Sequence, residues 1–227
     1  VLHGFDNFHT GANAELVDRL QTLASAAVAD ALGAWISGAP GGGKSHLLQA
    51  TCRWADAAGR HAIYVPLRDL AASARSVESL EADLLALDDV ESWLGDAALE
   101  PVLLGLYQQQ LQAGGQIVFS AVKTAQQSSF SLADLGSRCR ALPGYRVVMP
   151  DDEGLRAILT AAAHSRGLTL TSAVLDYWLH RAVRALPELM AQLQRLDEQA
   201  LVEQRAIPIP LIKEVLELCA RQAGIAR

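Results

Sequence analysis

The chain has 227 residues, of which 51% are hydrophobic and 19% charged, and its formal net charge is −6 at pH 7. This length allows one well-buried core with a smaller appendage, and no apolar run reaches the roughly 18–20 residues that span a bilayer. The acidic balance, with a pI of about 5.5, and the absence of any run of four Lys or Arg argue against a dedicated DNA-binding domain. The three cysteines lack C-x-x-C spacing, so we expect neither a zinc site nor a disulfide framework.

Helix and strand patterns alternate through residues 1–150. An apolar face predicts a helix over 13–32, capped by Thr10 or Asn13. A second helix is predicted over 46–55, and a third over 101–112 has Leu111 among its inward side chains. Apolar segments predict five strands, at 34–37, 61–66, 83–89, 116–120 and 145–149. Apolar strands alternating with helices are typical of an α/β domain whose parallel sheet is covered on both faces.

The pattern changes after Pro150, where four helices and no strand are predicted. Thr171 or Ser172 can cap the second of these helices, and Pro187 fits the first turn of the third. We therefore expect an α/β domain over residues 1–150 and a small all-α domain over residues 151–227.

The segment from Gly38 to Ser45 fits G-x-x-x-x-G-K-[ST], the phosphate-binding P-loop, between a predicted strand and a predicted helix. Glycines let the loop turn its N–H groups toward phosphates, and the helix N-terminus adds a positive dipole end. Lys44 is predicted to reach the β- and γ-phosphates, and Ser45 to ligate Mg²⁺. The sequence thus predicts binding of ADP or ATP with Mg²⁺ by Gly38, Pro40, Gly41, Gly42, Gly43, Lys44 and Ser45.

Two acids end the predicted strand at 83–89. In a P-loop protein, Asp88 is expected to help hold Mg²⁺, as a metal-site residue together with Ser45, and Asp89 to polarise the attacking water. Hydrolysis also needs a cation near the γ-phosphate, and Arg138 is a candidate finger acting on a neighbouring subunit. An ordinary surface arginine is the alternative for Arg138.

Taken together, these motifs resemble the DnaA clade of AAA+ ATPases. The matching segments are 5–13 (the "F-D-N-F…G…N" pattern), 38–46 (the P-loop with its following His), 87–90 ("L-D-D-V") and 134–138 ("D-L-G-S-R"). The resemblance implies an AAA+ module with a helical lid. It also implies that Phe8, Gly11 and His46 belong to the nucleotide site, and that Arg138 is the intersubunit finger.

Within the clade, segments 166–170 and 207–216 resemble the Hda family, which consists of the AAA+ module alone. Members of that family bind ADP, dock on the DNA polymerase sliding clamp and stimulate hydrolysis of ATP bound to the DnaA initiator. The resemblance implies a cytoplasmic bacterial inhibitor of replication initiation that has no membrane contact and reaches DNA only through its partners. It also leaves room for a homo-oligomer.

Three departures from the clade pattern affect these expectations. Ser120-Ala121 stands at the sensor-1 position, and Pro187 stands at the sensor-2 position, with Arg184 three residues earlier. Both departures predict weak intrinsic ATPase activity. No "Q-L-x-L-P-L" clamp-binding peptide is present, so either it precedes Val1 or clamp docking is lost. The alternatives are a self-acting P-loop ATPase, such as a helicase loader, and an AAA+ fragment of DnaA, although the Hda-like ending argues against the fragment.

Overall fold

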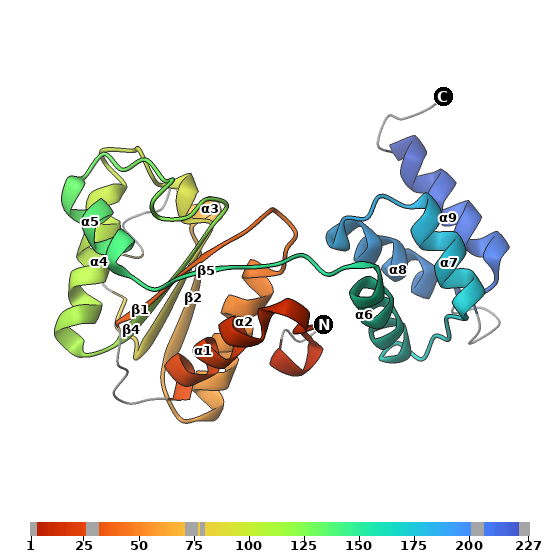
Figure 1. Cartoon of the computed structure of the whole chain (residues 1–227), viewed down its shortest axis with the longest axis horizontal. Helices are drawn as coiled ribbons and strands as arrows, with labels where there is room; N and C mark the ends of the chain where they lie inside the picture. Colours follow the sequence, from red (N-terminus) through yellow and green to blue (C-terminus); the bar gives the residue numbers. More distant parts are fainter. Residues whose placement is uncertain (1–3, 26–31, 71–76, 78–79, 201–206, 223–227) are drawn as a thin grey trace. The chain divides into compact units, whose positions relative to one another are not determined.

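The computed structural model describes residues 4–25, 32–70, 77, 80–200 and 207–222. The chain divides into two compact units, Val1–Met149 and Pro150–Arg227, each with its own apolar core (Figure 1). None of the helices in the described ranges combines the length and hydropathy that crossing a bilayer requires.

The first unit is built on a five-stranded parallel sheet, which confirms the predicted α/β fold. Its strands are β1 (Gly33–Ser37), β2 (Ala62–Pro66), β3 (Leu84–Asp88), β4 (Gln116–Ala121) and β5 (Gly144–Arg146). They lie in the order β2-β3-β4-β1-β5, and all neighbours pair in parallel. Parallel pairing brings the carboxyl ends of the strands to one edge, where the P-loop and the acids of β3 meet.

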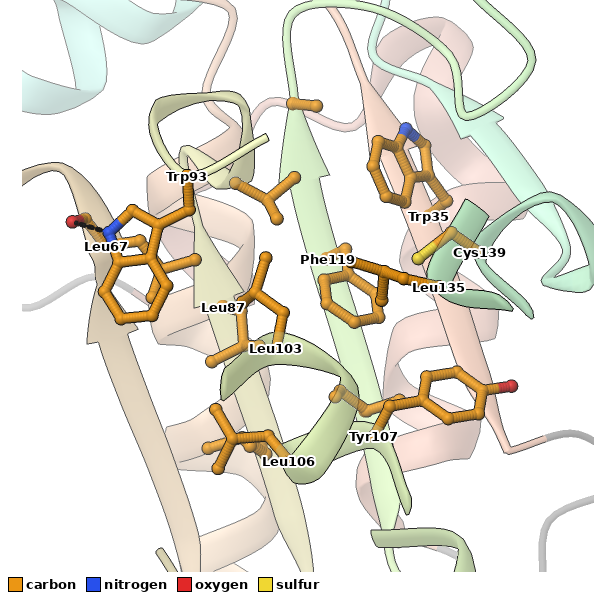
Figure 2. Packing of buried hydrophobic residues seen from close by; sticks show 14 of the residues in the cluster. Trp35, Leu67, Leu87, Trp93, Leu103, Leu106, Tyr107, Phe119, Leu135 and Cys139 are labelled. Carbon is orange, nitrogen blue, oxygen red and sulfur yellow. Dashed lines mark hydrogen bonds between the residues drawn. The ribbon is translucent and has the colours of Figure 1, made fainter. Parts of the chain in front are cut away.

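Helices cover both faces of this sheet because successive side chains in a strand point to opposite faces. The helices of the unit are α1 (Ala14–Ser25), α2 (Lys44–Ala57), α3 (Leu67–Leu70), α4 (Glu100–Ala113) and α5 (Ala133–Ala141), with short 3₁₀ turns at Phe5–Asn7, Gly11–Asn13 and Val90–Ser92. Ala34 and Ile36 of β1 pack with α1 and α2. Trp35 packs on the other face with α4 and α5 (Figure 2).

Three details of this unit differ from the sequence predictions. β5 ends at Arg146, which pairs with Ser37, the last residue of β1 before the P-loop. Beyond this strand, the Asn13 side chain bonds both the amide and the carbonyl of Val148. Asn13 therefore does not cap α1, and Thr10 makes no capping bond either. Leu111 is 51% exposed, since Gln110 takes the inward position at that end of α4. The predicted extension of α1 over 26–31 lies outside the described residues.

The second unit contains, in the part that the structure describes, the four predicted helices and no strand. They are α6 (Asp152–His164), α7 (Ser172–Arg181), α8 (Leu186–Ala200) and α9 (Ile209–Gln222). Asp151 caps α6 through the Gly154 amide, and Thr171 caps α7 through the Val174 amide. At the centre of this unit Trp178 is fully buried, and its indole N–H donates to the Gln192 side chain at 2.6 Å.

Candidate functional site

The P-loop connects β1 to α2 and wraps around the start of that helix. Gly43, at the N-cap of α2, has φ of +95°, and a Cβ placed there would lie 3.0 Å from the Phe8 ring. A side chain at Gly43 would therefore be both strained and crowded. Gly38 is crowded by a different residue, since a Cβ placed there would lie 3.1 Å from Val147. The glycines allow the loop to pack tightly against the amino-terminal segment and the residues after β5.

Lys44 spans this loop from the first turn of α2. Its side chain is buried, and its Nζ donates to the carbonyl oxygens of Gly38 at 2.9 Å and Ala39 at 3.2 Å. Ser45 follows on the exposed side of the helix. The lysine charge and the amino end of a 14-residue helix thus meet at one point, an arrangement that favours an anion.

The amino-terminal segment lies against the P-loop. The Phe8 ring lies 5.7 Å from the His46 ring, and His46 Nε2 is 2.9 Å from the Gly4 carbonyl oxygen. Burial lowers the pKa of His46, assisted by the Arg53 charge and opposed by the Gly4 contact. Gly11 has φ of +44° at the start of the turn before α1. This segment brings aromatic and apolar surface beside the phosphate loop.

The carboxylate of Asp88, at the end of β3, is almost fully buried and holds three hydrogen-bond donors. Tyr64 of β2 donates its hydroxyl to Oδ2 at 2.7 Å. Oδ1 accepts from the Ser120 hydroxyl of β4 and from the Asp89 amide, which lies 3.1 Å away. Burial, and then the bond and charge of Asp88, raise the pKa of Tyr64 to about 12. Asp88 is thus fixed by residues from both neighbouring strands.

Asp89 adopts a left-handed backbone conformation, with φ of +53°, which is uncommon outside glycine. Its Oδ2 lies 3.1 Å from Nε of Arg68, a residue of the short helix after β2. Sequence reasoning did not find Arg68 or Tyr64. Their only signal was position, since both lie at the carboxyl end of a strand expected to adjoin the acidic one.

Arg138 lies on α5, which covers the face of the sheet opposite α2 (Figure 1). Its Nε is 3.1 Å from Oδ1 of Asp134, and its guanidinium lies 5.7 Å from the centre of the Tyr107 ring. Arg140, on the same helix, lies over the Phe130 ring instead. The fold therefore does not bring Arg138 to the P-loop helix of its own chain.

The residues at the sensor-1 position and near the sensor-2 position have partners within their own units. In β4, Ala121 is buried and its carbonyl accepts the Gly38 amide, while the neighbouring Ser120 supplies a hydroxyl to Asp88. In the helical unit, Arg184 pairs with Asp152 at 2.7 Å. Among the described residues no group of three or more His, Cys, Asp or Glu side chains could hold a metal ion. The hydroxyl of Ser45 and the carboxylate of Asp88 suit Mg²⁺ chemically, and Mg²⁺ commonly uses one or two carboxylates together with substrate phosphates.

A family model and a sequence relative both match this chain. The family model described as "Hda, lid domain" matches residues 151–216. An uncharacterized protein of Haemophilus influenzae is 32% identical over 217 residues, which are 94% of this chain and 93% of that protein.

Solved structures agree on the fold. Domain III of the Thermotoga maritima replication initiation protein DnaA aligns with a TM-score of 0.81 at 20% identity, over 95% of each chain. DnaA from Aquifex aeolicus, in a structure bound to AMPPCP, aligns with a TM-score of 0.70 at 21% identity, over 98% of this chain and 69% of that one. The chain therefore belongs to the DnaA clade of AAA+ proteins, where it is similar to Hda and related to replication initiation.

Proposed function

We propose that this chain is a nucleotide-binding regulator of chromosome replication initiation, which stimulates hydrolysis of ATP bound to the DnaA initiator when the sliding clamp is present. In this proposal residues 1–150 form the nucleotide-binding domain and residues 151–227 form the lid. The Hda-type match over 151–216 supports the regulatory role.

Nucleotide binding is supported by the P-loop geometry and by the solved DnaA structures that contain AMPPCP. Lys44 and the loop amides, with the amino end of α2, would hold the phosphates of ADP or ATP. Ser45 and Asp88 would hold Mg²⁺, whose role is to neutralise phosphate charge. Asp89 would orient water, while Phe8, Gly11 and His46 would adjoin the base.

The observation that carries the regulatory proposal is the place of Arg138 on α5, across the sheet from the P-loop helix. From there it would serve a neighbour's nucleotide. Its ion pair with Asp134 is an exposed i,i+4 contact, and such pairs contribute only about 0.3–0.5 kcal/mol. Releasing the guanidinium to a phosphate of DnaA-bound ATP therefore costs little, while an arginine supplied to a neighbour's site can accelerate hydrolysis by about 10³–10⁵.

The test adds the protein to DnaA–ATP with clamp-loaded DNA and follows phosphate release. Arg138→Ala is expected to abolish stimulation while circular dichroism and ADP binding stay unchanged, because the side chain contacts Asp134 and the Tyr107 ring, on the face of the sheet opposite the P-loop helix. Arg138→Lys should rescue poorly, since an ammonium cannot reproduce the planar, two-pronged contact of a guanidinium.

The matched control is Arg140→Ala, which removes a second arginine from the same helix and should keep full stimulation. If Arg138→Ala stimulates as well as the wild type and Arg140→Ala does not, Arg140 is the finger. If neither variant loses stimulation, or if the wild type gives none, this chain does not inactivate DnaA. Rapid ATP turnover by the chain alone, near 1–10 s⁻¹, would instead support a self-acting ATPase.

A further inference from the structure

Tyr64 lies between the two residues that are candidates to hold Mg²⁺. Its hydroxyl donates to Oδ2 of Asp88 at 2.7 Å. The side chains of Ser45 and Gln49 also lie within hydrogen-bonding reach of this hydroxyl. A single neutral side chain thus links the P-loop serine to the acid of β3.

The backbone arrangement explains why this tyrosine can reach Asp88. Tyr64 is paired with Ala86, and Asp88 is two residues further along β3 on the same face of the sheet. Ala86 is fully buried and too small to block the ring. On the helix that covers this face, Ser45 and Gln49 are four residues apart and so lie on one side of α2. Three elements therefore converge on one phenol oxygen.

The acceptor capacity of Asp88 is nearly used by protein groups. A carboxylate offers about four lone-pair sites, and Asp88 already accepts from Tyr64, from Ser120 and from the Asp89 amide. Only 3% of the residue is exposed. Two of these donors are on Oδ1, so the one acceptor site left for a metal-bound water is on Oδ2, beside the Tyr64 hydroxyl.

In P-loop proteins Mg²⁺ is held by the loop Ser or Thr and by a Walker-B acid, for which the candidate here is Asp88 at the end of β3. A water on the metal donates an O–H to that acid, and Tyr64 donates an O–H to Asp88. We propose that Tyr64 is a built-in substitute for the metal-bound water, which lets this chain bind a nucleoside diphosphate with little dependence on Mg²⁺. This inference rests on the nucleotide binding proposed above.

Positive charge for a diphosphate does not have to come from the metal at this site. Lys44 is buried across the loop, and it lies in the first turn of α2, whose amino end adds a positive dipole. Tyr64 keeps Asp88 hydrogen-bonded when the metal is removed. Without this hydroxyl, Oδ2 would be a buried carboxylate oxygen without a donor, which is costly until a metal-bound water supplies one.

The experiment measures ADP affinity by calorimetry in excess Mg²⁺ and again in EDTA. For the wild type the two affinities should agree within about threefold. Tyr64→Phe removes only the hydroxyl, so its affinity should become roughly tenfold or more higher with Mg²⁺ than with EDTA, the effect of one hydrogen bond to a charged group. Tyr64→Phe combined with Asp88→Asn should lose that dependence again, because the neutral amide no longer attracts the metal.

Tyr145→Phe is the matched control, since it removes a phenol hydroxyl from β5 in the same unit and should leave the ratio of affinities at the wild-type value. A wild type that loses ADP affinity tenfold or more in EDTA would overturn the role of Tyr64 even if Tyr64→Phe failed to fold, and it would leave the proposed function standing. A Tyr64→Phe protein with the wild-type ratio would overturn it as well. Absence of ADP binding in both conditions would overturn nucleotide binding, and this inference with it.

Discussion

The two units of this chain bury different kinds of side chain. In the first unit, ten polar or charged side chains of the described residues are buried, and four of them, Ser37, Lys44, Asp88 and Ser120, lie at the carboxyl edge of the sheet. Among the described residues of the second unit, Gln192 is the one buried polar side chain, and it serves the indole of Trp178. The first unit therefore buries polar side chains of the candidate site beside its apolar core, whereas the described core of the second unit is almost entirely apolar.

The largest effect expected from this comparison is on folding stability in the helical unit. Trp178→Ala removes a fully buried indole and leaves Gln192 without its partner, so it should lower the free energy of unfolding by about 3–5 kcal/mol. Urea unfolding followed by circular dichroism measures this loss. Trp54→Ala removes an indole that is 41% exposed on α2 and should cost clearly less. Equal losses for the two variants would mean that the helical unit does not depend on this core.

The fold could be predicted from sequence because its determinants are local. Apolar strands alternating with amphipathic helices gave the α/β order, and Asp151, Thr171 and Pro187 mark helix starts that the structure retains. The end of β5 was missed because it is set by β1, whose last residue, Ser37, pairs with Arg146 before the chain enters the P-loop. That limit lies in the partner strand and not in the apolar pattern of residues 145–149.

The candidate site was predictable only in part, for the same reason. The P-loop residues are contiguous, so their spacing carries the motif. Tyr64 contacts Asp88 and Arg68 contacts Asp89, and those contacts depend on the register in which β2 pairs with β3. Before that pairing is known, a tyrosine in an apolar strand and an exposed arginine give no sign of a role.

The second prediction concerns the buried charge of the first unit. Lys44→Ala should weaken ADP binding by roughly tenfold or more, because charge-assisted hydrogen bonds contribute on the order of 1.5–3 kcal/mol. Calorimetry with ADP measures the change. The matched control is Lys213→Ala on α9, where the lysine is exposed and only 3.9 Å from Glu217, and its ADP affinity should equal that of the wild type. Equal affinity for Lys44→Ala and wild type would show that the P-loop lysine does not contact the phosphates.

The smallest expected effect concerns Arg68, which holds the carboxylate that we expect to orient water. The Arg68 side chain is 65% exposed, and its ion pair with Asp89 at 3.1 Å is of the kind that contributes about 0.2–1 kcal/mol. Arg68→Ala frees Asp89 Oδ2 for a water molecule, so intrinsic ATP turnover should rise by roughly two- to fivefold. Steady-state phosphate release from the chain alone measures this, and Asp89→Asn in the same background should remove the gain.

The helical unit offers a matched control for this last test. Arg156 makes an exposed ion pair with Asp176, so Arg156→Ala removes the same kind of contact away from the site and should leave turnover unchanged. A rise in both variants would point to a general effect of lowering the positive charge of the protein. A fall in Arg68→Ala would mean that Arg68 holds Asp89 in its working position, and that the left-handed conformation of Asp89 depends on the guanidinium. Only a rise confined to Arg68→Ala agrees with Arg68 as a restraint on the acid of the first unit.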